Sequence, residues 1–402
     1  MSDRLPSIFV STGSTSSDML AAPVLRELRN RGAVGKITAL GGSALREAGA
    51  HPLSDTTPLS SVGVASSCRS VLCHCAAVIR AYRRVGRLFR RQRPSLVILV
   101  DNPGQNLRIL SMAHRMGIPT LYYVPPEAWC LTRWQIAKIA RQSTSIAALS
   151  LSEAQTYREY GGNVRWIGHP ALDLLQSCPS SPRPHEPNGH PPTIGLFPGS
   201  RRDEVIDLLP VLREAARLIH QAEPSARFIL CSANDSVQKR ILAHLPAWNT
   251  PVELVHRQSH AVLSRCDLLL TCSGTATLEA AIMGVPMVAM YRVHHLLDKL
   301  IRLALVRYSY FALPNYLLNR PIVPELCNRQ VTGRRVADEG LSLLRDVSRR
   351  RAMLDGLADV RKALGGGGAV MRAADLAHHL LENSAAPEVD RWIGAEVAAG
   401  HV

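Results

Sequence analysis

The stretch IGLFPGSRRDEV, residues 194–205, decides the fold of this chain. Its first four residues are mostly apolar and predict a buried strand, which a Pro-Gly pair ends before Ser200 can cap a helix that begins with Arg201. Backbone N–H groups around Gly199 point outward at such a turn, and the helix dipole favours negative charge there. Arg201 and Arg202 can add charge-assisted hydrogen bonds to a phosphate. Taken alone, the stretch fits an ordinary strand-to-helix connection with surface arginines equally well.

A second turn of the same design lies further along the chain, in CSGTATLE, residues 272–279. An apolar run leads into the small residues Ser273, Gly274 and Thr275, and a helix follows. Hydroxyls and N–H groups at this turn can also bind an anion. Glu279 can accept hydrogen bonds from a ribose, or it is a first-turn acid that favours the helix dipole. A repeated turn in the same half of the chain favours a phosphate site.

The first half of the chain opens with a similar unit. Residues 7–11 predict a strand, and a polar turn with Gly13, Ser14 and Asp18 leads into a helix. A strand, a small-residue turn and a helix form the opening unit of a doubly wound sheet. These three residues are therefore candidates for substrate binding.

Asp101 follows a strongly apolar segment. Residues 96–100 (LVILV) predict a buried parallel strand. The ligand crevice of an open α/β sheet lies beyond the carboxyl ends of its strands, so Asp101 is a candidate general base. The N-cap of the next helix is an equally good interpretation of Asp101. His169, in the turn IGHP, is either a ligand-binding or hinge residue or a structural one.

The domain organisation follows from an abrupt change of composition at residues 176–192 (QSCPSSPRPHEPNGHPP), which predicts a linker. The strand-helix rhythm restarts after it, so we expect an α/β protein with two Rossmann-like domains that face one another across a cleft. Residues 311–325 are expected to form a loop-rich return. The expected parts are an N-terminal domain at 1–175, the linker, a C-terminal domain at 193–364, a helix at 365–384 that crosses back to the first domain, and a tail at 385–402.

Composition restricts the partners and the compartment. The chain has 402 residues, a net charge of +15 and a pI near 9.9, which predict an anionic partner. Aromatic residues make up only 5% and are not interleaved with arginine-rich stretches, so nucleic acid is not the expected partner. The start of the chain lacks the pattern of a signal peptide, and the longest apolar region is interrupted by polar residues and proline, which argues against a membrane span. Nine irregularly spaced cysteines fit the reduced thiols of a cytosolic protein, and no metal-ligand spacing is found.

Residues 76–93 predict a basic amphipathic helix, because apolar residues recur at helical spacing between seven arginines. Such a helix can lie on an anionic membrane surface. The alternative is a helix that packs on the sheet and leaves a solvated basic face.

The ordered set GSTSSD, LVDNPGQN, YVPPEAW, IGHP, FPGSRRDEV, SGTATLE, GVPMV and LPNYLLNRPIVPEL resembles the lipid-A-disaccharide synthase family from about residue 8 to about residue 380. The resemblance implies a GT-B fold glycosyltransferase that is cytoplasmic and peripheral on the Gram-negative inner membrane, whose anionic surface it contacts. The family joins UDP-2,3-diacylglucosamine to 2,3-diacylglucosamine 1-phosphate in a β-1,6 linkage and releases UDP. The resemblance implies neither a metal nor another cofactor, and a homodimer is a possible assembly.

The resemblance also implies roles for individual residues. Asp101 would take the proton of the acceptor hydroxyl, Arg201 and the two phosphate turns would stabilise the departing diphosphate, and Glu279 would bind the donor ribose. The remaining residues expected to bind substrate are Gly13, Ser14, Asp18, Asn106, His169, Gly199, Ser200, Arg202, Ser273, Gly274, Thr275, Asn315 and Glu325.

Three motifs in the first half depart from the family pattern, and one of them is the family's WAW motif, whose aromatic pair is reduced to Trp129 with Leu131. The family usually has GEASGD at the first turn, where this chain has Ser14 in place of the glutamate and Ser17 in place of a glycine. The second carboxylate of the family, three residues after the Asp101 position, is Gly104 here. Two alternatives therefore stay open: a divergent GT-B enzyme with another lipid acceptor, and a non-catalytic nucleotide-sugar binder on the membrane surface.

Overall fold

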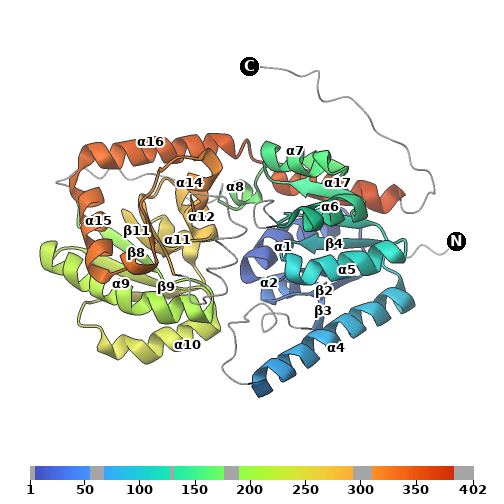
Figure 1. Cartoon of the computed structure of the whole chain (residues 1–402), viewed down its shortest axis with the longest axis horizontal. Coiled ribbons are helices and arrows are strands. Elements are labelled where there is room, and N and C mark those ends of the chain that lie inside the picture. Colours follow the sequence, from blue (N-terminus) through green and yellow to red (C-terminus); the bar gives the residue numbers. More distant parts are fainter. Residues whose placement is uncertain (1–4, 55–67, 127–130, 176–189, 293–309, 384–402) are drawn as a thin grey trace.

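The computed structural model contains two parallel β-sheets, each covered by helices (Figure 1). It describes residues 5–54, 68–126, 131–175, 190–292 and 310–383. Most of the predicted linker at 176–192, and the predicted tail at 385–402, lie outside these ranges.

The first sheet has seven parallel strands in the order β3-β2-β1-β4-β5-β6-β7. Its central strand β4 is the predicted LVILV segment, and all five of its residues are buried because helices cover both faces of the sheet. The order of the strands reverses between β1 and β4, which are hydrogen-bonded neighbours. The strands are β1 (Ile8–Ser11), β2 (Ile37–Leu40), β3 (His51–Ser54), β4 (Leu96–Val100), β5 (Thr120–Tyr123), β6 (Ser145–Ala148) and β7 (Val164–Trp166).

Two hydrophobic clusters flank the first sheet. One lies under α1 (Thr15–Asn30), α2 (Ser43–Glu47) and the C-terminal helix α17 (Ala369–Asn383). The other lies under α4 (Cys68–Gln92), α5 (Pro103–Arg115), α6 (Arg133–Gln142) and α7 (Leu151–Glu159). Helix α17 therefore completes the first domain, although it comes from the other end of the chain.

The second sheet has six parallel strands in the order β10-β9-β8-β11-β12-β13, and its order reverses between β8 and β11. The strands are β8 (Thr193–Phe197), β9 (Arg227–Ser232), β10 (Glu253–His256), β11 (Leu268–Cys272), β12 (Met287–Tyr291) and β13 (Glu325–Cys327). The helices are α9 (Arg202–Ala222), α10 (Asp235–His244), α11 (Ser259–Leu263), α12 (Thr275–Ile282), α14 (Leu313–Leu318), α15 (Gly333–Arg345) and α16 (Val347–Ala363), with single 3-10 turns at Leu245–Ala247 and Asn328–Gln330.

Two connections join the domains. The short helix α8 (Pro170–Leu175) follows the first sheet, yet its residues Leu172 and Leu175 pack in the core of the second domain. The carboxylate of Asp173 in α8 accepts hydrogen bonds from the backbone N–H groups of Gly368 and Val370, where α17 begins. Arg372 of α17 donates to the carbonyl oxygen of Ile167 at 2.9 Å. The start of α17, where the chain returns to the first domain, is thus held by hydrogen bonds to both α8 and the segment before it.

The structure differs from the sequence expectation at two sheet edges. Residues 311–325, expected as a loop-rich return, contain the helix α14 and lead directly into the edge strand β13. Strand β3 was not predicted, because its sequence HPLS is short and contains a proline, which sheets accept only at an edge or a bulge.

Candidate functional site

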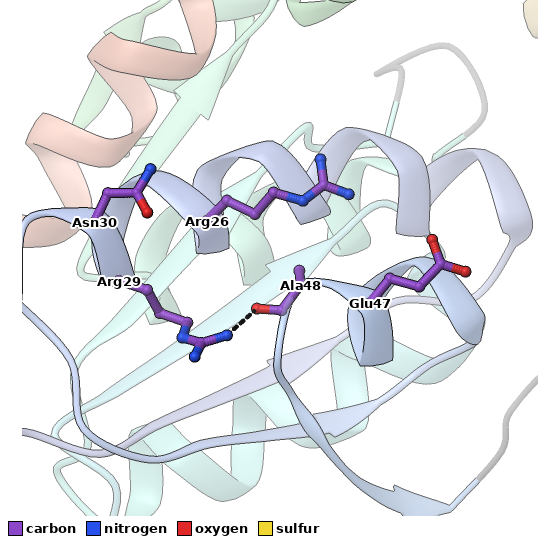
Figure 2. Close-up of a pocket in the computed structure, with 5 residues that line it drawn as sticks. All are labelled: Arg26, Arg29, Asn30, Glu47 and Ala48. Carbon is purple, nitrogen blue, oxygen red and sulfur yellow. Dashed lines mark hydrogen bonds between the residues drawn. The ribbon is translucent and has the colours of Figure 1, made fainter.

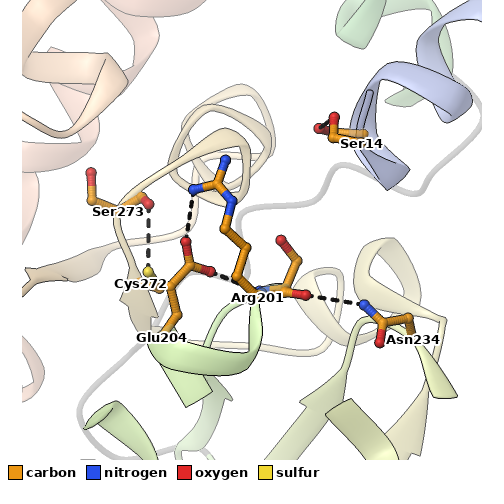
Figure 3. A network of polar contacts seen from close by, with 8 residues as sticks. Ser14, Arg201, Glu204, Asn234, Cys272 and Ser273 are labelled. Atoms are coloured by element: carbon orange, nitrogen blue, oxygen red, sulfur yellow. Dashed lines mark hydrogen bonds and ion pairs between the residues drawn. The ribbon is translucent and has the colours of Figure 1, made fainter. Parts of the chain in front are cut away.

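The candidate site is formed by four turns at the carboxyl ends of the central strands. Strands β1 and β4 end at the switch point of the first sheet, and β8 and β11 end at that of the second. Ligands of open α/β sheets bind at such points. The positive charge of Arg201, which follows β8, lowers the pKa of the Asp101 carboxyl, which follows β4. Figure 3 shows Ser14, which follows β1, across from Arg201 and Ser273 of the second domain, so the two switch points face one another.

Asp101 lies in a restricted backbone conformation. Asp101 and Asn102 have φ values of 50° and 40°, in the left-handed region that non-glycine residues rarely adopt. Asn102 is the N-cap of α5 and accepts a hydrogen bond from the N–H of Gln105. The interpretation of Asp101 as the N-cap is therefore wrong, and its carboxylate is left for other contacts.

The environment of Asp101 suits a base. Burial raises the pKa of its carboxyl, while the backbone N–H of Asn102, the charge of Arg201 and the hydroxyl of Ser17 act in the opposite direction. A base works best when its pKa is not far from the working pH, so the net upward shift favours proton transfer.

Asn106 and Tyr122 hold the backbone of Asp101. The carbonyl oxygen of Asp101 accepts hydrogen bonds from Asn106 Nδ2 and from the Tyr122 hydroxyl, both at 2.9 Å. Asn106 is completely buried, and its amide oxygen accepts from the Ser11 hydroxyl at 2.7 Å. We propose that Asn106 supports the site without touching substrate. Tyr122 was missed from the sequence, because a tyrosine in an apolar strand is indistinguishable from an ordinary core residue.

The turn after β1 is fixed by close contacts. A Cβ atom on Gly13 would lie 1.7 Å from the side-chain nitrogen of Asn102, so only glycine fits there. Asp18 is nearly buried and accepts hydrogen bonds from the hydroxyl of Thr12 and from the N–H of Gly42. The carboxylate of Asp18 thus ties β1 to the segment after β2, while Ser14 caps α1.

The turn after β8 differs from the expectation in one respect. Helix α9 begins at Arg202 with Arg201 as its N-cap, so the predicted cap by Ser200 is wrong. Oε2 of Glu204 accepts hydrogen bonds from the N–H groups of Ser200 and Arg201, both at 3.1 Å, and Oε1 accepts from Nη1 of Arg201 at 2.9 Å (Figure 3). Two N–H groups that were expected to face a phosphate are thus bonded to a carboxylate of the chain itself. Gly199 has a φ of 112°, which favours glycine.

Asn234 reinforces this turn and was not predicted. Its Nδ2 donates to the carbonyl oxygen of Ser200 at 3.1 Å (Figure 3), and its Oδ1 caps α10. The turns after β8 and β9 are therefore linked.

The turn after β11 leaves donors available. Gly274 has φ and ψ values of 151° and −157°, and as the residue before α12 it offers no side chain to cap the helix. The first N–H groups of a helix have no partner within the helix, so those at Thr275 can bind an anion. The hydroxyl of Ser273 donates to the carbonyl oxygen of Phe311 and fixes the turn.

Glu279 lies beyond the first turn of α12, so a first-turn acid does not describe it. One of its carboxylate oxygens is 3.5 Å from Nε2 of His260, and this contact raises the pKa of that histidine. Because a carboxylate has several acceptor sites, Glu279 can also accept from a ribose.

Asn315 and Glu325 hold one segment together. Asn315 is nearly buried, and its amide nitrogen donates to Glu325 at 2.7 Å. Glu325 also accepts from the N–H groups of Phe311 and Ala312 at 2.8 and 3.0 Å. The carbonyl oxygen of Phe311 accepts a hydrogen bond from Ser273 in the turn after β11. We therefore propose that Asn315 and Glu325 hold this turn in place through Phe311.

His169 is a neutral acceptor at the junction. Burial lowers the pKa of His169 to about 4, and its Nδ1 accepts a hydrogen bond from the N–H of Ala171 at 3.2 Å. Nε2 then carries the proton and is the nitrogen that can donate to a ligand. Trp129 of the motif YVPPEAW lies outside the described residues.

A pocket between α1 and α2 is not part of this site. It is lined by Arg26, Arg29, Asn30, Glu47 and Ala48, and Arg29 donates to the carbonyl oxygen of Ala48 at 3.1 Å (Figure 2). Arg26, Arg29 and Asn30 lie in the C-terminal part of α1, opposite the end that carries Ser14, and Glu47 and Ala48 lie at the C-terminal end of α2.

Comparison with known proteins shows the family of this chain. A family model for lipid-A-disaccharide synthetase matches residues 8–374. The lipid-A-disaccharide synthase of Nitrosococcus oceani is 32% identical over 385 residues, which are 95% of this chain and 98% of that protein. That of Anaeromyxobacter dehalogenans strain 2CP-C is 34% identical over 373 residues, 92% and 96% of the two chains.

Solved structures show the same fold at low identity. The UDP-N-acetylglucosamine 2-epimerase of Neisseria meningitidis, bound to UDP-N-acetylglucosamine, has a TM-score of 0.62 at 14% identity, with 94% of this chain and 100% of that one covered. The calicheamicin glycosyltransferase has a TM-score of 0.59 at 14% identity, with 96% and 100% covered. The chain therefore belongs to the lipid-A-disaccharide synthase family and is a glycosyltransferase of lipid A biosynthesis with the GT-B fold.

Proposed function

We propose that this chain transfers 2,3-diacylglucosamine from UDP to 2,3-diacylglucosamine 1-phosphate with inversion at the anomeric carbon. Two features support the proposal: Asp101 and Arg201 follow the strands at the two switch points, and the charge of Arg201 lowers the pKa of the Asp101 carboxyl. A base and a phosphate-binding cation on opposite sides are what an inverting displacement needs, because the nucleophile and the leaving group lie on opposite faces of the sugar.

In this mechanism Asp101 removes the proton of the acceptor hydroxyl as its oxygen bonds to the anomeric carbon of the donor. The bond between that carbon and the diphosphate oxygen breaks, and UDP leaves. The products are the β-1,6 disaccharide, UDP and a protonated Asp101, which then returns its proton to solvent.

The second domain stabilises the negative charge on UDP. Arg201, Arg202 and the uncapped N-terminus of α12 supply positive charge, so we propose that the transfer needs no metal. The carboxylate of Glu279 accepts hydrogen bonds from the ribose hydroxyls. The epimerase neighbour, whose structure holds UDP-N-acetylglucosamine, supports a nucleotide-sugar site in this fold.

The direct test is to incubate the purified protein with both substrates. We expect equimolar UDP and disaccharide, with activity that is retained in excess chelator. UDP release only with a different acylated acceptor would instead indicate the divergent enzyme, and the departures at Ser14 and Gly104 are what favour that second candidate. Donor binding without turnover on any acceptor would contradict both.

We further propose that the protein works at an anionic membrane surface through α4. Its apolar residues Val85, Leu88 and Phe89 are buried, and Phe89 packs on Phe9 with ring centroids 5.3 Å apart. Its exposed arginines are Arg80, Arg83, Arg84, Arg87, Arg90 and Arg91. The helix thus packs its apolar side on the sheet and exposes its basic side, as the second interpretation of this stretch expects, and the proposal of membrane binding rests on the exposed arginines. Within the described ranges no helix is long and apolar enough to cross a bilayer.

Flotation with anionic liposomes tests this second proposal. Binding should disappear when Arg83, Arg84, Arg87 and Arg90 are changed to Glu, since each arginine near such a surface contributes about 1 kcal/mol. It should also weaken as salt is raised. A matched control changes four exposed arginines of the second domain, Arg227, Arg335, Arg351 and Arg361, to Glu, with the same change in net charge. Equal loss in both variants, or insensitivity to both salt and the α4 changes, would refute a role for α4.

A further inference from the structure

A group of three serine hydroxyls lies at the start of α1. The hydroxyl of Ser14 is 2.7 Å from that of Ser17 and 3.0 Å from that of Ser16. Ser14 also accepts a hydrogen bond from the backbone N–H of Ser17 at 3.2 Å. The side chain of Ser17 is thus held by its neighbour in a fixed orientation.

Ser17 connects this group to Asp101. Its hydroxyl is 3.5 Å from Oδ2 of Asp101, and the residue is only 2% exposed. An ionised carboxylate can only accept, so Ser17 donates to Asp101 and its oxygen accepts from Ser14. A chain of hydrogen bonds with one direction therefore runs from Ser14 through Ser17 to the carboxylate.

The same two serines are positions where this chain departs from the family pattern GEASGD. Ser14 replaces a glutamate and Ser17 replaces a glycine, which has no hydroxyl. The structure shows that the two departures contact one another and that one of them contacts Asp101. Because the two serines form one chain of contacts that ends at the Asp101 carboxylate, we expect them to act together on that carboxylate.

We propose that Ser17, held by Ser14, is a positioning residue that fixes the carboxylate of Asp101 through Oδ2 in the orientation that takes the proton of the acceptor hydroxyl. The inference rests on the proposed function, in which Asp101 is the base. The other groups that act on the Asp101 carboxyl are Arg201 from the second domain and the N–H of Asn102, while Tyr122 and Asn106 donate to its backbone carbonyl oxygen. None of these fixes Oδ2 from the side of α1.

The test is Ser17→Ala, which removes the hydroxyl and keeps the cap by Ser14. Loss of a hydrogen-bond donor raises the pKa of a carboxyl. The acidic limb of the plot of kcat against pH should therefore move to higher pH, by up to about one pH unit. On the plateau kcat should fall about fivefold, as expected for one lost hydrogen bond, with KM for both substrates unchanged. Ser14→Ala should move the limb in the same direction by less, and it should also lower Tm because the cap is lost.

Ser16→Ala is the matched control, because Ser16 contacts Ser14 but not Asp101, and it should leave the pH profile unchanged. An Asp101→Asn variant is measured in parallel. If that variant is inactive while Ser17→Ala keeps the parent limb and kcat, the positioning role fails and the proposed function stands. If Asp101→Asn is itself active, the base assignment fails instead. A fall in kcat with a lower Tm but an unmoved limb would show a merely structural serine and also overturn the inference.

Discussion

Replacing Asp101 by Asn should lower kcat by about 10²- to 10⁴-fold, the contribution typical of a positioned general base. The amide keeps the shape of the carboxylate and loses its ability to take a proton. Binding of UDP should not change, because the donor-side turns belong to the other sheet. Initial rates with saturating substrates, together with UDP affinity by calorimetry, give both quantities.

The Asn variant should fold at least as well as the parent. Asp101 has a φ of 50°, a conformation that Asn adopts at least as readily as Asp. Burial raises the pKa of this carboxyl, so its contribution favours the folded state at acid pH and is lost as the pH rises through the raised pKa. At neutral pH the ionised group therefore costs stability, and the neutral amide removes that cost. A Tm equal to or above that of the parent separates lost chemistry from lost fold.

In the parent enzyme the same shift sets the pH dependence. Activity should fall as the pH drops through the pKa of Asp101, and the midpoint should lie above the ordinary range for aspartate. Asp355→Asn, an exposed carboxylate on α16, is a suitable control and should behave like the parent. Robust activity in Asp101→Asn would exclude Asp101 as the base.

The fold could be predicted from sequence because its strands are buried on both faces and give unbroken apolar runs. Residues 96–100 are the strand β4 without any shift, and the prediction of a GT-B protein with two Rossmann-like domains is confirmed. Two edge strands, β3 and β13, could not be predicted. The HPLS segment of β3 has no run of apolar residues, and among the described strands the short β13 pairs only with β12. Pairing at an edge depends on a neighbour that is distant in sequence, which local pattern does not reveal.

The sequence predicted where the turns of the candidate site lie, but not the hydrogen bonds that their residues make. The turns at Asp101 and Arg201 were located because glycine turns after strands mark carboxyl edges. The hydrogen bonds within the site could not be predicted, because many of them join residues that are distant in sequence. One example is the bond from the Tyr122 hydroxyl to the carbonyl oxygen of Asp101. The carboxylate of Glu204 in the phosphate turn is a similar case, although a glutamate at the third position of a helix is a known partner of the N-cap N–H.

Changing Arg201 to Ala should weaken UDP binding by about 10- to 150-fold, the equivalent of a charged hydrogen bond worth about 1.5–3 kcal/mol. The side chain of Arg201 is 70% exposed, so its ion pair with Glu204 adds little to stability and the fold should be unaffected. The variant also removes the cation that Arg201 places beside the carboxylate of Glu204. Part of the loss should therefore come from repulsion between that carboxylate and the diphosphate.

A double-mutant cycle separates the two effects. Glu204→Gln keeps an acceptor for the N–H groups of the turn and removes the charge, so the double variant Arg201→Ala with Glu204→Gln should bind UDP more tightly than Arg201→Ala alone. Arg213→Ala, an exposed arginine on the same helix, is the control and should bind UDP like the parent. Arg201 also lowers the pKa of Asp101, so its loss should move the acidic limb of kcat upward. An unchanged UDP affinity in Arg201→Ala would show that the phosphate lies elsewhere, and an unchanged limb would show that the two switch points do not act on one another in the working enzyme.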